Sequence, residues 1–317
     1  MKDKRETWNN IANERLEKAK TGSAILKQKK GHRFSTSSNF IDKCPSLQLN
    51  DDISMYLDAS DAFIIGGSMD DASDAIFRAA SIYKHEIPDS IAEAADLYYR
   101  AGNIAINKEK QRKSFENSVS AYCDDEDYFR AARVQLVMAK NEEVLHDRTK
   151  AIEEYRAASQ FFQAIKMDEQ VICCCKKVAQ LLVDLEEYTS AAQEFFDLGL
   201  MQLKFNLQKY HAKKSFFLSC LLLLASSEHT LSNASAQIEK AKNADFRFDS
   251  EYQFLNNILG LITKVQEETK DESAQPSTLD EFADHLFEYN QVFPFDHVEL
   301  KLLNQVHTKY FNAKCKN

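Results

Sequence analysis

The sequence predicts an all-α protein, an α-solenoid built from tetratricopeptide-like helix pairs. Only 7 Gly and 4 Pro occur in 317 residues, too few turn-forming residues for a many-stranded sheet. Ala, Leu, Glu, Lys and Gln, which are good helix formers, fill the long segments instead. From about Asp51 onward, apolar residues recur three and four positions apart, as in Ile91, Ala95, Tyr98 and Ala101.

One local pattern recurs along this helical region. A small or aliphatic residue is followed three positions later by an aromatic residue, and three later again by a small or apolar one. The copies are Ala95–Tyr98–Ala101, Ile152–Tyr155–Ala158 and Ala192–Phe195–Leu198. Small residues let two helices approach closely, and the 40 residues between Tyr155 and Phe195 are near the period of a tetratricopeptide-like pair. An unrelated helical bundle, which has the same 3.6-residue periodicity, stays open as the alternative.

Segments without a helical period indicate the breaks. Residues 21–50 are rich in Ser, Lys and Asn, and we expect a long loop there after a first helix near residues 6–20. Ser90 is the expected N-cap of a later helix, with Glu93 at the capping-box position. Residues 267–277 read as a polar linker.

The charge is unevenly distributed. The net charge of −9 argues against nucleic-acid binding. Residues 1–50 carry 11 Lys/Arg and 5 Asp/Glu, a net +6, which leaves −15 for the rest of the chain. Such an arm suits an anionic membrane surface, and a solvated, disordered tail is the other interpretation.

The cysteines and the polar start of the chain bear on its compartment. Seven cysteines without a disulfide-like spacing predict a reducing compartment. Cys173, Cys174 and Cys175 would point about 100° apart on a helix, so they cannot share one metal ion. The first 17 residues are polar, and the longest apolar run, Cys220–Ala225, is far shorter than the ~20 residues of a membrane span. We expect a soluble, cytoplasmic protein.

The motifs that carry common enzyme chemistry are missing from the sequence. Gly66-Gly67 has no Gly-Lys-Ser/Thr after it, the eight histidines are dispersed, and no GxSxG elbow occurs. We therefore predict a protein that is not an enzyme and needs no cofactor or metal.

Six motifs in order resemble the alpha-type soluble NSF attachment proteins, the SNAP family. They are Tyr56–Phe63, Ala101-Gly102-Asn103, Lys150–Tyr155, Lys177-Val-Ala179 with Glu186-Glu-Tyr188, Lys209-Tyr-His-Ala-Lys-Lys-Ser-Phe-Phe217, and Phe248–Glu251. The resemblance implies a right-handed solenoid that ends in a C-terminal helical bundle. It also implies an adaptor that binds the SNARE complex and recruits the ATPase NSF for SNARE disassembly in vesicle fusion. The expected division is an N-terminal helix and membrane-facing loop over 1–50, a solenoid over 51–240, and a C-terminal bundle and tail over 241–317.

The resemblance also suggests which residues meet each partner. The cations expected to contact SNAREs are Arg133, Lys213, Lys108, Lys110, Lys176 and Lys177, whereas Cys173 stands where the family has a lysine. The expected membrane loop contains Ile25, Leu26, Lys27, Lys29, Lys30 and Phe34, although these apolar residues could instead pack back on the solenoid. The expected NSF contacts are Glu267, Glu268, Leu302 and Leu303.

The tail differs from the family pattern, which ends in acidic residues and a penultimate leucine. Residues 310–317 are basic and lack that leucine, so stimulation of NSF is in question. Two alternatives stay open: a generic tetratricopeptide-like scaffold that captures peptides, and a divergent SNAP that binds without stimulating NSF. The expected location is cytoplasmic and peripheral on membranes.

Overall fold

A computed structural model describes residues 2–31, 45–87, 89–205, 208–226, 231–245, 248–268 and 277–311. Side chains are described for these residues except 2–3, 22–31, 45–48, 268 and 277–279. Within these ranges the regular structure is entirely α-helical. The prediction of an all-α helical-repeat fold is confirmed.

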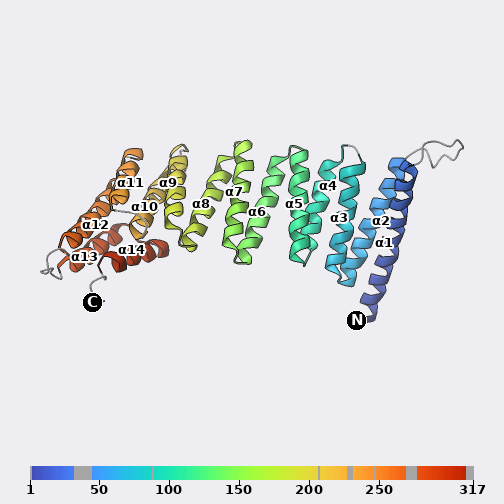
Figure 1. Cartoon of the computed structure of the whole chain (residues 1–317), viewed down its shortest axis with the longest axis horizontal. Coiled ribbons are helices and arrows are strands. Elements are labelled where there is room, and N and C mark those ends of the chain that lie inside the picture. Colours follow the sequence, from blue (N-terminus) through green and yellow to red (C-terminus); the bar gives the residue numbers. More distant parts are fainter. Residues whose placement is uncertain are drawn as a thin grey trace. The chain divides into compact units, whose positions relative to one another are not determined.

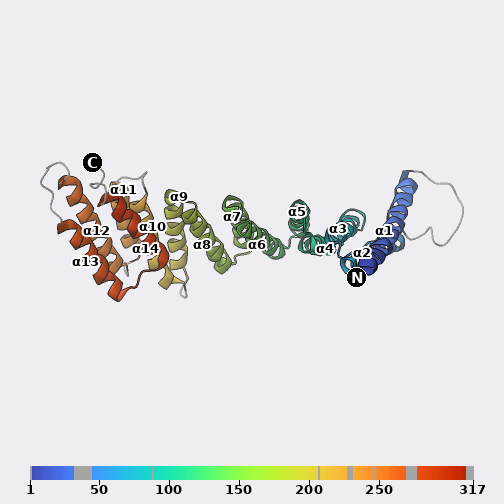
Figure 2. The same ribbon diagram turned by 90° about the horizontal axis from the view of Figure 1, so that it is seen from below.

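The chain divides into two compact units, Met1–Met167 and Asp168–Asn317. Unit 1 contains α1 (Lys2–Gly31), α2 (Pro45–Gly66), α3 (Met69–Glu86), α4 (Ile91–Ile104), α5 (Lys108–Asp124), α6 (Tyr128–Val144) and α7 (Arg148–Ala164). Each helix packs against the next, and successive helices run in opposite directions (Figure 1). Figure 2 shows α5 and α7 in one layer of this unit and α4 and α6 in the other.

Unit 2 begins with the same arrangement of consecutive packed helices. It contains α8 (Asp168–Asp184), α9 (Tyr188–Leu203), α10 (Lys209–Ala225), α11 (Leu231–Ala244), α12 (Asp249–Glu268), α13 (Ser277–Val292) and α14 (His297–Tyr310). The long-range contact of this unit is that of α14, which returns to pack on α10. The proposed three-part division of the chain stays a prediction.

Five consecutive helices, α5 to α9, begin 20 residues apart. The turns that join them are three residues long, and the middle residue of each has a positive φ: Glu126 (59°), His146 (60°), Lys166 (58°) and Glu186 (62°). In the first of them, the Glu126 N–H donates to the Cys123 carbonyl and the Asp127 N–H to the Tyr122 carbonyl, which is a Schellman ending. The same pair of bonds recurs in the other three turns. This 20-residue step is half of the 40-residue period expected from the sequence.

The recurring small–aromatic–small pattern forms the core. All nine residues of its three copies are buried. In two copies the next residue is a glycine on which an aromatic ring from the following helix rests. A Cβ atom on Gly102 would lie 2.6 Å from the Phe115 ring, and one on Gly199 would lie 2.6 Å from the Phe216 ring. The absence of a side chain at these two positions therefore lets neighbouring helices approach closely.

The long loop expected over residues 21–50 is a correction. Helix α1 continues to Gly31 and α2 begins at Pro45, so much of this segment is helical. Ser90 does precede α4, as expected, but its side chain makes no capping hydrogen bond. No described helix is long and apolar enough to span a bilayer.

Candidate partner-binding surfaces

The outer face of α6 carries cations without acidic partners. Arg133 and Lys140 are exposed on this face, two turns apart, and neither forms an ion pair with any described residue. The Arg133 guanidinium lies over the ring of the exposed Phe129, 5.9 Å from its centroid. Val137 and Val144 continue the same stripe, because residues three and four apart share one face of a helix. This surface can therefore offer positive charge and apolar area together.

The expected cations of α5 differ from each other. Lys110 is held by Asp74, with Nζ 2.7 Å from the carboxylate, and this hydrogen bond raises the pKa of Lys110. Lys108 is exposed in the first turn of α5 and forms no ion pair with described residues. Of these two side chains, Lys108 has the freedom to contact a partner and Lys110 links α5 to α3.

A buried carboxylate joins three helices of unit 1. Glu154 of α7 accepts hydrogen bonds from Gln135 of α6 and from Arg112 of α5, the latter at 2.9 Å. Arg112 also bonds to Glu142 at 3.0 Å. Burial raises the pKa of Glu154, although Arg112 opposes the shift. These partners consume the charge of Glu154, so the cluster serves packing.

An apolar cavity of about 230 Å³ lies beside this cluster. Its floor is formed by the buried Phe115 and Met138, and Lys108 and Lys150 lie at its rim. Lys150 is paired with Asp147 at 2.8 Å. A partner's apolar side chain would fit this cavity.

The cations of α8 belong to unit 2. Lys176 and Lys177 are exposed, as is Cys173 one turn earlier. Cys174 is buried, and this burial raises the pKa of its thiol to about 12. Because these neighbouring thiols occupy different environments, they act separately, and the described residues hold no cluster that could bind a metal ion.

Lys213 of α10 is engaged inside unit 2. Its Nζ lies 3.0 Å from the buried Glu251 carboxylate of α12 and 5.5 Å from the centroid of the Phe293 ring. Since removal of one partner would leave the other charge buried, this lysine supports the packing of α10 on α12.

The expected NSF contacts also differ in exposure. Glu267 is exposed at the end of α12, whereas the Glu268 side chain lies outside the described residues. Leu302 and Leu303 are fully buried in α14. The two leucines offer no surface to a partner, which corrects the expectation of direct contact.

The residues expected in a membrane loop cannot be assigned contacts. Residues 25–30 continue α1, but their side chains, like Phe34, lie outside the described residues. The basic tail after residue 311 also lies outside them.

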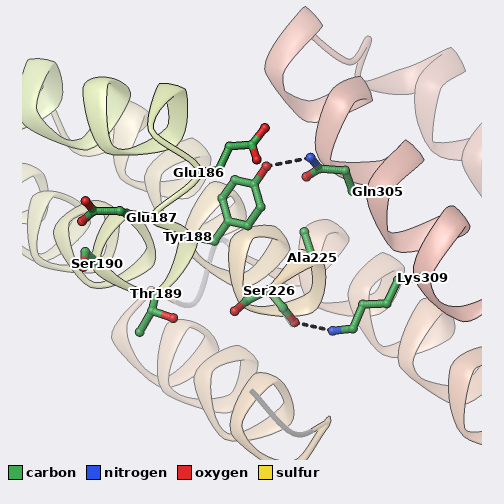
Figure 3. Close-up of a pocket in the computed structure, with 9 residues that line it drawn as sticks. All are labelled: Glu186, Glu187, Tyr188, Thr189, Ser190, Ala225, Ser226, Gln305 and Lys309. Atoms are coloured by element: carbon green, nitrogen blue, oxygen red, sulfur yellow. Dashed lines mark hydrogen bonds between the residues drawn. The ribbon is translucent and has the colours of Figure 1, made fainter. Parts of the chain in front are cut away.

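A second cavity, of about 620 Å³, lies in unit 2 between the start of α9, the end of α10, and α14 (Figure 3). The Gln305 amide donates to the Tyr188 hydroxyl at 2.6 Å, and Lys309 donates to the Leu224 carbonyl at 3.2 Å and to the Ser226 carbonyl. Burial lowers the pKa of Lys309. These bonds satisfy carbonyls at the end of α10 and fasten α14 there.

Sequence reasoning missed Lys140 and Phe129. Their signal is present, because Phe129, Arg133, Val137, Lys140 and Val144 follow a spacing of four, four, three and four residues. A stripe with this spacing was assigned to the core when it was apolar, whereas here the structure turns it outward.

The fold and these surfaces define a helical-repeat protein with binding surfaces along its helices. The family model described as "Soluble NSF attachment protein, SNAP" matches residues 25–310. The chain therefore belongs to the soluble NSF attachment protein family.

Identity to individual members is low. An alpha-soluble NSF attachment protein of Dictyostelium discoideum is 24% identical over 60% of this chain and 61% of its own length. A beta-soluble NSF attachment protein of Bos taurus is 27% identical over 53% of this chain and 56% of its own. A vesicular-fusion protein SEC17 of Komagataella phaffii is 25% identical over 78% and 74%. The chain thus spans less than two thirds of the first two relatives. A tetratricopeptide-sensor STAND protein of Pyrococcus horikoshii covers 85% of this chain and 38% of its own at 13% identity and TM-score 0.36, too weak a likeness to bear on the fold.

Proposed function

We propose that this protein is a non-enzymatic adaptor that binds SNARE four-helix bundles and recruits an NSF-type ATPase for their disassembly. Membership of a family named for NSF attachment supports the second part. The outer face of α6 supports the first, because Arg133 and Lys140 are exposed cations without acidic partners beside an exposed aromatic ring. Such a face suits an acidic helical bundle.

The decisive experiment is a pull-down with a preassembled SNARE bundle, with and without NSF. We expect Arg133→Glu with Lys140→Glu to weaken SNARE binding roughly tenfold and to reduce its dependence on salt. Lys240→Glu, on an exposed lysine of α11, is the matched control and should bind normally. An unchanged affinity in the double variant would remove α6 from the proposed interface.

Lys213 should be left out of this test of binding. Reversal of its charge would place two carboxylates together at a buried position, so lost binding could come from lost structure. Lys176, which is exposed on α8, is a cleaner probe for unit 2.

A peptide-binding scaffold is a second candidate, favoured by the apolar cavity between α5, α6 and α7. Binding of short extended peptides but not of helical bundles would support it. A disassembly assay with NSF and ATP separates the third alternative, an adaptor that binds without turnover. Contact between the N-terminal segment and anionic membranes belongs to the same proposal and is supported by the composition of residues 25–34.

A further inference from the structure

A row of exposed apolar side chains follows one edge of unit 1. The first turns of α1 and the α2–α3, α4–α5 and α6–α7 turns lie at this edge (Figure 1). Each turn presents a large aliphatic residue: Ile65 is 57% exposed, Ile106 68% and Val144 77%, with Leu145 beside it. Trp8 is also exposed, in the part of α1 nearest this edge. We propose that this aliphatic edge, formed by Trp8, Ile65, Ile106, Val144 and Leu145, docks on the surface of a lipid bilayer.

The turn that carries Ile106 is held rigidly. The Asp70 carboxylate of α3 accepts the N–H groups of both Ile106 and Asn107 at 2.9 Å. The Asn107 side chain then caps α5 by accepting the N–H groups of Glu109 and Lys110. With its backbone held on both sides, Ile106 stays outside the core in a fixed position.

The other two turns are held as firmly. The His146 N–H donates to the Glu143 carbonyl and the Asp147 N–H to the Glu142 carbonyl, which fixes the turn after Val144. At the α2–α3 turn, Gly66 lies against the Asn9 side chain and the Arg5 carbonyl, so the end of α2 adjoins the first turns of α1. Ile65 and the start of α1 therefore lie close together.

The spacing of these side chains favours a bilayer over a protein. Packed helices are 8–10 Å apart, and consecutive turns at one edge are separated by two helices, hence by roughly 20 Å. Protein interfaces concentrate their energy in a central cluster of contacts. A bilayer interface instead accepts apolar side chains independently of one another, and tryptophan is enriched there. Four separate apolar positions that include the Trp match the second case.

Charge at the edge favours apolar contact. Asp74 is paired with Lys110 and Asp147 with Lys150, and Asp70 is bound to backbone. Three exposed cations and three exposed acids remain near the turns and cancel: Lys4, Arg5 and Lys108 against Glu6, Asp71 and Glu109. The fitting ligand is thus a zwitterionic phospholipid surface, and its binding should respond little to salt.

This edge is separate from the segment between α1 and α2. The end of α1 at Gly31 and the start of α2 at Pro45 lie at the opposite ends of these helices (Figure 1). One flat bilayer patch can meet one edge only. The two membrane contacts, and the SNARE proposal, can therefore fail independently.

The chain contains one tryptophan, so Trp8 fluorescence reports on this edge without labelling. With small phosphatidylcholine vesicles, the full-length protein should co-float and its emission should shift to the blue, equally in about 0.1 and 0.5 M salt. Ile106→Asp with Val144→Asp should lower vesicle binding at least tenfold. Val292→Asp is the matched control, because Val292 of unit 2 is 68% exposed. It should bind normally.

Three results would overturn the proposal. They are absence of both flotation and a Trp8 shift in the unaltered protein, unchanged binding of the double variant, and loss of binding in high salt. Lys27→Glu with Lys29→Glu and Lys30→Glu should leave binding to phosphatidylcholine intact, and a loss there would assign the contact to the α1–α2 segment. Circular dichroism of each variant verifies folding, and Ile65→Asp offers an independent third position.

Discussion

Substitution of Gly102 by alanine tests the close packing of α4 on α5. The new Cβ would lie 2.6 Å, 2.7 Å and 3.0 Å from three atoms of the Phe115 ring, which is buried and has little room to move. Overpacking of this kind costs about 1–3 kcal/mol, and replacement of a helical glycine by alanine returns about 0.5–1 kcal/mol. We expect a net loss of about 1–2 kcal/mol in the free energy of unfolding.

The same reasoning gives the opposite sign at Gly260. This residue is exposed in α12, and a Cβ there would meet nothing within 4 Å. Gly260→Ala should therefore stabilise by about 0.5–1 kcal/mol. Gly199→Ala, against Phe216, should behave like Gly102→Ala but in unit 2.

Urea and thermal unfolding followed by circular dichroism measure these differences. A loss of 1–2 kcal/mol corresponds to roughly 3–6 °C in a unit of about 150 residues. Because the two units can unfold separately, each transition should be fitted on its own. Phe115→Leu should partly rescue Gly102→Ala. If Gly102→Ala proves as stable as the unaltered protein, the ring does not rest on the glycine and the close approach of α4 and α5 is refuted.

Two further predictions concern unit 1. Glu126→Gly should stabilise by about 0.5–1 kcal/mol, because Glu126 has a φ of 59° that costs an L-residue about 1–2 kcal/mol, part of which glycine loses as entropy. Denaturant midpoints measure this gain, and Ser120→Gly inside α5 should show a loss instead. Burial raises the pKa of Glu154 above 4.5, so the folded state holds this proton more tightly and stability falls as pH rises from 4.5 through the raised value. Unfolding free energies against pH should show a smaller fall in Glu154→Gln, and identical slopes would contradict the shift.

Local patterns were enough to predict the helices and their core. Ala95, Tyr98 and Ala101 were selected by spacing, and all three are buried. The extent of α1 was not predictable in this way, because Ser, Lys and Gln in residues 21–31 give no apolar period although they are compatible with a helix.

Candidate site residues were harder to predict, because exposure depends on partners distant in sequence. Lys213 is engaged by Glu251, 38 residues later, and nothing near Lys213 announces that pairing. Leu302 and Leu303 did carry a warning, since with Val306 they form the spacing of a buried helix face, and all three are buried.

The 20-residue step from α5 to α9 limits how this chain can change in length. Each step reverses the direction of the helix that follows, so a gain or loss of 20 residues would exchange the two edges of everything downstream. A gain or loss of 40 residues restores both direction and face. Within such an array, viable length variants of the protein should therefore differ by whole helix pairs, with each turn keeping its left-handed residue at the same place.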